Sequence, residues 1–135
     1  MTAGKPILPF IPAYLPTCVC LLLVLYLTLF PKPLGDEEIE LFEGADKVVH
    51  FIMFGGLTGT FIFDRRRTLR TLPMAGAVAT AFVVTALGGV IELLQDAMDM
   101  GRGGDPADFT ADLLGAFAAV GICRMLGWIK VRSAA

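Results

Sequence analysis

The chain has 135 residues, of which 56% are hydrophobic and 18% are charged, and its mean hydropathy is +0.71. An ordinary soluble domain carries about 25% charged residues, so the composition argues against that class of protein. The length allows one compact unit. The net charge of −2 is uninformative by itself, and no feature of the chain points to a nucleic-acid partner. We therefore expect a single membrane domain over residues 1–135.

Four apolar runs stand out, at about 13–30, 48–63, 73–94 and 109–128. Each approaches the ~20 residues that a helix needs to cross ~30 Å of hydrocarbon. Helices of a soluble bundle would show a polar stripe at every turn, and these runs do not. The pattern predicts an all-α membrane protein with four transmembrane helices.

The basic residues predict how these spans are oriented. Eight of the eleven fall on one side of a four-span topology, namely Lys5, Arg65, Arg66, Arg67, Arg70, Arg124, Lys130 and Arg132. Cytoplasmic segments carry an excess of lysine and arginine. Both termini are therefore predicted to be cytoplasmic, and both acidic loops are predicted to lie outside.

The first span contains no ionisable side chain, and Pro31 and Pro33 end it. The loop that follows carries Asp36, Glu37, Glu38, Glu40 and Glu43. This loop is either simply solvated or a vestibule that concentrates cations. The three cysteines lie in or near spans without metal-ligand spacing, so we expect neither a disulfide nor a zinc site.

The second span opens with the sequence A-D-K-V-V-H. On a helix, Asp46 and His50 are i,i+4 neighbours, and Lys47 lies near the same face. Gly55 and Gly59 form a G-x-x-x-G pair, which lets a neighbouring helix approach closely. The D-R-R-R run that ends the span is expected to anchor it at the cytoplasmic surface.

The third span starts at Pro73, a favourable early helical position. It becomes polar only at its outer end, where Glu92 and Gln95 are three residues apart and share a helix face. The second outer loop is rich in glycine and carries Arg102.

The fourth span follows Asp105, which is a plausible helix N-cap because proline occupies the next position. Asp108 and Asp112 lie four residues apart, and Gly115 and Ala119 continue near that stripe. One face of this helix thus carries polar side chains at its outer end and small side chains along the rest of its length. This pattern is suited to close packing against another helix.

The topology gathers nine polar side chains at the outer ends of the last three spans: Asp46, Lys47, His50, Glu92, Gln95, Arg102, Asp105, Asp108 and Asp112. An ionisable group inside a span costs about 2.5–3.5 kcal/mol on insertion scales, so such groups normally face partners or a wet cavity. A structural clamp between helices would explain part of this set, but nine polar groups exceed what a clamp requires. We predict an outer-face polar pocket.

Three chemistries compete for this pocket. His50 and Glu92 are the candidate catalytic pair for proton transfer, because a neighbouring carboxylate raises the basicity of an imidazole. Lys47 and Arg102 would hold an anionic headgroup. The remaining predicted binding residues are Asp46, Gln95, Asp108 and Asp112. The third reading is a divalent cation bound by His50 with Asp108, Asp112 and Glu92. One histidine without H-x-x-x-H or H-x-x-E-H spacing is a weak metal signature, so no metal site is predicted.

The spaced motifs also suggest a family. They are D-K-x-x-H-F-x-x-F from Asp46, G-x-x-x-E-x-x-Q from Gly88, the single Arg102, and D-x-x-x-D-x-x-G from Asp108. Together they cover roughly residues 15–127, and this order resembles the VanZ-like family. The chain departs from the family at Asp112, where members commonly have asparagine, and the change adds a negative charge to an acidic site.

The resemblance implies a small, multi-span protein of the bacterial inner (cytoplasmic) membrane. The founding member of the family is associated with low-level resistance to the glycopeptide teicoplanin. The resemblance therefore implies an envelope role, with a lipid or lipid-linked cell-wall precursor as the expected partner. It supplies no reaction, so the cofactor stays unknown and it stays open whether the protein is an enzyme.

Two other functions are compatible with the sequence. In the first, the polar cluster only orders the helices, and the acidic loop of a non-enzymatic membrane factor binds a partner protein. In the second, the chain is a transporter, which its small size disfavours unless it forms a homo-oligomer. The sequence leaves the oligomeric state open.

Overall fold

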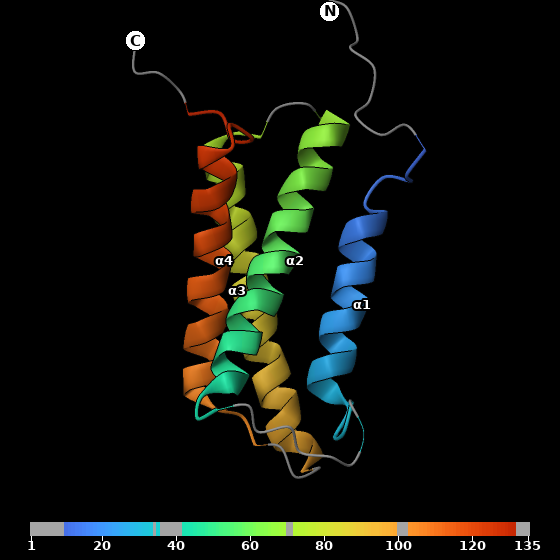
Figure 1. Cartoon of the computed structure of the whole chain (residues 1–135), viewed down its shortest axis with the longest axis vertical. Coiled ribbons are helices and arrows are strands. Elements are labelled where there is room, and N and C mark those ends of the chain that lie inside the picture. The colour runs from blue at the N-terminus through green and yellow to red at the C-terminus, as the bar shows by residue number, and fades with distance from the viewer. Residues whose placement is uncertain (1–9, 34, 36–41, 70–71, 100–102, 132–135) are drawn as a thin grey trace, which may run out of the picture.

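In a computed structural model the chain forms a bundle of helices that run alternately up and down (Figure 1). The structure describes residues 10–33, 35, 42–69, 72–99 and 103–131. The helices are α1 (Leu15–Leu29), α2 (Ala45–Leu69), α3 (Met74–Met98) and α4 (Pro106–Met125). Within the described residues there is no strand, only an isolated bridge between Pro73 and Lys130. The all-α prediction is therefore confirmed.

The prediction of four membrane-spanning helices is confirmed only in part. Among the described residues, α3 and α4 are the helices long and apolar enough to cross a membrane. The helix α1 is apolar but has 15 residues, because Pro16 fixes its start and the chain becomes extended at Phe30. The helix α2 has 25 residues but carries ionisable groups in its first and last turns.

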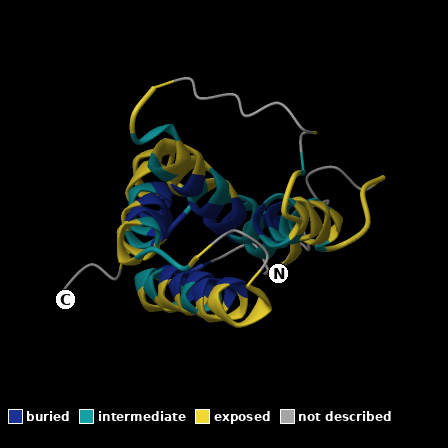
Figure 2. Cartoon of the chain, turned by 90° about the horizontal axis from the view of Figure 1, so that it is seen from below, coloured by how far each residue is buried: buried dark blue, intermediate teal, exposed yellow. Residues whose placement is uncertain are grey.

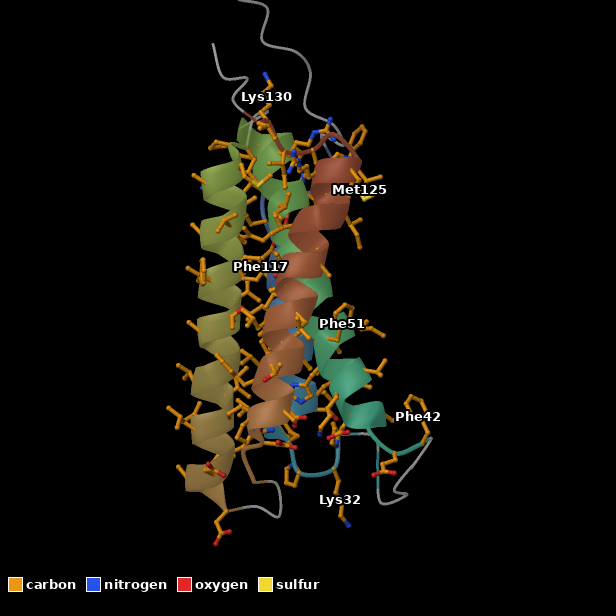
Figure 3. The ribbon with its side chains drawn as sticks, turned by 90° about the vertical axis from the view of Figure 1, so that its left-hand side faces the viewer. Lys32, Phe42, Phe51, Phe117, Met125 and Lys130 are labelled. Carbon is orange, nitrogen blue, oxygen red and sulfur yellow. The ribbon has the colours of Figure 1, made fainter. Side chains whose placement is uncertain are left out.

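The outside of the bundle is more apolar than that of a soluble helical bundle. Large apolar side chains cover the outside, including Leu22, Val83 and Leu93, each at least two-thirds exposed. Figure 3 shows side chains projecting from the helices along the whole bundle, with Lys32 and Lys130 at opposite ends. The inward faces are buried (Figure 2) and include ionisable groups as well as apolar ones. An apolar exterior around a partly polar interior indicates a membrane protein.

The helices α2 and α4 pack backbone to backbone. A Cβ atom built on Gly55 would lie 3.0 Å from the carbonyl oxygen of Gly115, and one built on Gly115 would overlap the carbonyl oxygen of Phe51. Only glycine fits at such a crossing. The close packing predicted for Gly55 and Gly115 is therefore present, whereas a Cβ on Gly59 would meet open space.

A buried ion pair joins α1 to the far end of α2. The fully buried Asp64 carboxylate accepts hydrogen bonds from the Thr17 N–H (3.0 Å), the Thr17 hydroxyl (2.6 Å) and Arg67 Nε (2.7 Å). The Arg67 guanidinium also donates to the carbonyl oxygens of Ile11 and Pro12. Two members of the D-R-R-R run thus fasten α1 to the bundle, a role that we did not predict.

Candidate functional site

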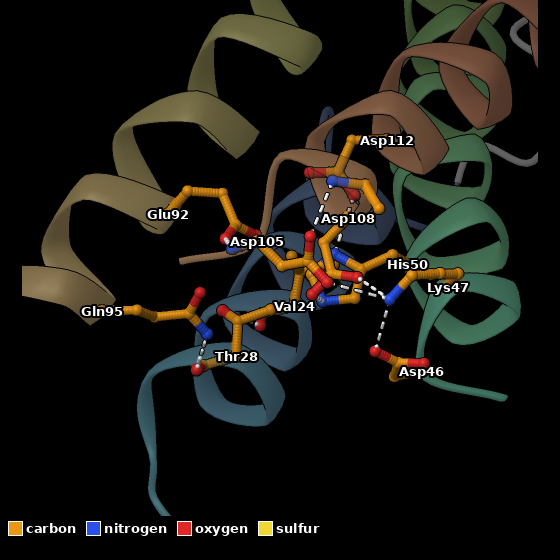
Figure 4. Close-up of polar contacts among 11 residues, drawn as sticks. Val24, Thr28, Asp46, Lys47, His50, Glu92, Gln95, Asp105, Asp108 and Asp112 are labelled. Carbon is orange, nitrogen blue, oxygen red and sulfur yellow. Dashed lines mark hydrogen bonds and ion pairs between the residues drawn. The ribbon is translucent and has the colours of Figure 1, made fainter. Parts of the chain in front are cut away.

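The candidate site lies where the first turns of α2 and α4 meet the last turns of α3 (Figure 4). The helix α2 begins directly after Gly44, whose φ of +82° turns the chain into the helix. The Asp105 side chain caps α4, because its Oδ1 accepts the Ala107 N–H at 2.8 Å. The predicted N-cap is thus confirmed. These local signals bring residues from three parts of the sequence to the same end of the bundle.

Lys47 forms the charged rim of the site. Its ammonium donates to Asp46 Oδ2 at 2.9 Å, Asp105 Oδ2 at 3.0 Å and Asp108 Oδ1 at 3.2 Å. These hydrogen bonds to three carboxylates raise the pKa of Lys47. The hydrogen bond from Lys47 lowers the pKa of Asp46, and the bonds from the Ala107 N–H and from Lys47 lower the pKa of Asp105. An ammonium has three protons to donate, so these partners account for all of them.

His50 lies one turn deeper and is buried. Its Nδ1 is 2.9 Å from Asp112 Oδ1, and its Nε2 is 3.7 Å from Asp108 Oδ2. The imidazole stacks on Phe54, with the two rings 5° from parallel. With Asp112 ionised, its carboxylate can only accept a hydrogen bond, so Nδ1 carries a proton and Nε2 is the nitrogen that faces Asp108.

Two carboxylate oxygens in this interior have no hydrogen-bond partner among the residues that the structure describes. Glu92 is 8% exposed; its Oε2 accepts the Asp105 N–H at 2.7 Å, while Oε1 is buried and unpartnered. Asp112 is fully buried, and its Oδ2 is likewise unpartnered. A Cβ on Gly88 would overlap that Oδ2 atom, so a larger residue there would force the Asp112 side chain to move. Buried polar atoms are normally paired, and each exception needs an explanation.

Gln95 does not join this cluster. Its Nε2 donates to the carbonyl oxygen of Thr28 at 2.8 Å, near the end of α1. The last carbonyls of a helix lack intrahelical partners, so Gln95 acts as a cap that ties α1 to α3. Arg102, for which anion binding was predicted, lies outside the described residues. The ligand roles predicted from the sequence therefore stay predictions for both residues.

Within the described residues, two groups of side chains bring three possible metal-ligand atoms close together. His50, Glu92 and Asp108 place one ligand atom each within 4.8 Å of one another, and so do Asp46, Asp105 and Asp108. The first group is largely buried and contains the unpartnered Glu92 oxygen. The second group surrounds the Lys47 ammonium, which contacts all three carboxylates and offsets part of their charge.

Two cavities lie elsewhere in the bundle. One, of about 550 Å³, lies between α1, α2 and α3, and Thr17, Leu57 and Val84 are among its lining residues. The other, of about 330 Å³, lies along the glycines of α2 and α4. Neither is lined by a residue of the polar cluster.

The fold and this cluster define a small helical membrane protein with a buried group of ionisable residues at one end. The model of the VanZ/LLP1 family matches residues 17–127, so the chain belongs to that family, as its spaced motifs predicted. The searches of curated proteins and of solved structures gave no match.

Proposed function

We propose that the chain spans the bacterial inner membrane four times, at about 13–30, 48–63, 73–94 and 109–128, with both termini in the cytoplasm. Support comes from the apolar exterior of the bundle and from its charged ends. Arg65, Arg66 and Lys130 lie near one end, where α2 and α4 finish, and the carboxylates of the candidate site lie at the other. The positive-inside rule then puts the site at the outer leaflet.

We propose further that the site binds a lipid or lipid-linked cell-wall component and acts on it. The observation that carries this proposal is the pair of buried, unpartnered carboxylate oxygens on Glu92 and Asp112. A clamp that served only to order the helices would be more stable with every polar atom paired. A binding site without its ligand leaves unpaired the hydrogen-bond acceptors that the ligand will contact, and this cluster is otherwise well bonded.

In this proposal His50 and Glu92 are the residues that meet the ligand and exchange protons with it. Asp112 orients the imidazole through Nδ1, and Asp105 orients Glu92 through its backbone N–H. Lys47 holds Asp108 in place, and an anionic headgroup would have to displace a carboxylate to reach the ammonium. A role in resistance to teicoplanin belongs to the same proposal and is supported by family membership alone.

The alternative is a non-enzymatic membrane factor. The bonds that join α2 to α4 through Lys47 and His50 favour a clamp. In that case residues 35–44 would bind a partner protein, and replacing them would abolish function while substitutions in the cluster would reduce only stability. Of these residues the structure describes 35 and 42–44.

Mass spectrometry of lipids retained by the gently purified protein tests the proposal. Wild type is compared with Glu92→Gln and Lys47→Ala, with each variant first shown to be folded. We expect one lipid or lipid-linked species to be enriched over bulk lipid in the wild type and lost from folded Glu92→Gln. No enrichment in the wild type, together with variants that are merely less stable, would favour the clamp.

A further inference from the structure

Among the described residues, the candidate site has more carboxylates than cations. Five carboxylates converge there, from Asp46, Glu92, Asp105, Asp108 and Asp112. Lys47 is the one ammonium among the described residues that contacts them, and it contacts only those at the rim. In the buried part of the cluster, the one basic group within the described ranges is the imidazole of His50. Uncompensated carboxylates in an apolar interior are costly unless they are paired or coordinate a metal.

We propose that His50, Glu92 and Asp108 together bind one divalent cation. Their ligand atoms lie within 4.8 Å of one another. Two oxygens on opposite sides of a small divalent cation are about 4.2 Å apart, because each lies about 2.1 Å from it. Small side-chain rotations therefore bring all three atoms into one coordination sphere. Figure 4 shows Glu92 reaching from α3 toward Asp108 of α4 and His50 of α2.

The orientation of His50 is that of a metal ligand. Its Nδ1 faces Asp112 Oδ1 at 2.9 Å, and its Nε2 points to the Asp108 carboxylate at 3.7 Å. A histidine that binds metal through one nitrogen usually donates the other N–H to a carboxylate, which fixes the ring and raises its basicity. Asp112 occupies that orienting position, and it is fully buried.

Glu92 supplies the observation that distinguishes this site from a simple acidic cluster. Its side chain is more than nine-tenths buried, and Oε2 is already held by the Asp105 N–H. The second oxygen, Oε1, has no partner although it is buried. A carboxylate that is fixed through one oxygen and free at the other is preorganised to bind a cation. Asp46 and Asp105 lack this property because Lys47 contacts both and their side chains are about half exposed. Asp108 is more buried; it gives Oδ1 to Lys47 and turns Oδ2 toward His50.

The cation also explains how an acidic site would hold an anionic ligand. Mg²⁺ and Mn²⁺ take about six ligands and commonly bridge a few protein carboxylates to a phosphate group. Three protein ligands leave positions for phosphate oxygens, so the cation would bridge the cluster to a phosphate. This second step rests on the proposed function, whereas the cation site itself does not.

Mn²⁺ binding to the purified full-length protein, followed by electron paramagnetic resonance at pH 7, tests the cation site. We expect one bound Mn²⁺ per chain, with coupling to an imidazole nitrogen. Glu92→Gln, Asp108→Asn and His50→Gln should each weaken binding at least about tenfold. Asp99→Asn removes an exposed carboxylate outside the cluster and is the matched control, expected to bind as the wild type does. Equal binding by wild type and Glu92→Gln, or the lack of nitrogen coupling, would overturn the assignment.

A second measurement separates the cation site from the proposed function. Lipids retained by the wild type are compared before and after treatment with EDTA, with inorganic phosphate added in a parallel sample. Loss of the retained lipid in EDTA would support a cation that bridges the cluster to a lipid phosphate. Displacement of the lipid by inorganic phosphate would identify the phosphate group as the part of the lipid that contacts Mn²⁺. If Mn²⁺ binds but EDTA leaves the lipid in place, the bridging step is wrong. If lipid is retained without any Mn²⁺ site, the cation assignment is wrong and the proposed function stands.

Discussion

Gly115→Ala is expected to force α2 and α4 apart. The added Cβ would overlap the Phe51 carbonyl oxygen and would lie 2.9 Å and 3.0 Å from the carbonyl carbon and Cα of the same residue. All three atoms are backbone, so no change of rotamer relieves the contact. Because His50 precedes Phe51 and Asp112 lies one turn before Gly115, the separation would also stretch the His50–Asp112 contact.

The cost follows from the size of the overlap. Overpacking a closely packed interface by one methyl group costs about 1–3 kcal/mol. For a chain of this size, ~4 °C of melting temperature corresponds to 1 kcal/mol, so the midpoint should fall by roughly 4–12 °C. Thermal unfolding of the detergent-purified protein, followed by the fluorescence of the single tryptophan, Trp128, measures the shift.

Gly121→Ala is the matched control for this prediction. It lies on the same helix, and a Cβ there meets nothing within 4 Å. Alanine favours a helix over glycine by about 0.5–1 kcal/mol, so this variant should be as stable as the wild type or slightly more stable. Equal unfolding temperatures for Gly115→Ala and Gly121→Ala would refute the close approach of α2 and α4.

Three further predictions concern other parts of the bundle. Asp64→Asn leaves the buried Arg67 without its counter-ion and should cost about 3–5 kcal/mol in chemical unfolding; a loss below 1 kcal/mol would contradict the buried pair. Gln95→Leu removes the donor that caps α1 and should lower the free energy of unfolding by about 1–3 kcal/mol. Amide hydrogen exchange should increase first in α1, and unchanged exchange there would contradict the role of Gln95 as a cap. In a variant without native cysteines, the thiol of Glu43→Cys should react with a membrane-impermeant reagent in intact cells, and that of Val131→Cys should not. The reverse labelling pattern would show that the proposed topology is inverted.

Much of the candidate site was predictable because its signals are local. The i,i+4 spacing of Asp46 and His50, and of Asp108 and Asp112, puts each pair on one helix face without any tertiary information. The Asp105 cap follows from the proline after it. What sequence spacing could not predict is which carboxylate meets which cation, since that depends on how the helices rotate against one another.

The buried pair at the other end of α2 shows what the sequence concealed. Asp64 and Arg67 are i,i+3 neighbours, so their contact was visible in principle. Three consecutive arginines, however, resemble a cytoplasmic anchor, and only the packing of α1 shows that Arg67 is buried while Arg66 lies over Trp128. The spacing likewise assigns Gln95 to the pocket because it shares a face with Glu92, but it lies about one turn nearer the end of α3, where its amide meets the end of α1. In both cases a neighbouring helix decides the role of the side chain.

The thermal unfolding of Glu92→Gln tests most directly whether the cluster is a binding site or a clamp. Glutamine keeps an oxygen for the Asp105 N–H and removes the charge of a buried carboxylate whose other oxygen has no partner. If the cluster is a binding site whose buried charge lowers stability, the unfolding midpoint of Glu92→Gln in EDTA should equal or exceed that of the wild type. A midpoint several degrees lower would mean that the Glu92 charge holds the helices together, and would contradict the proposal.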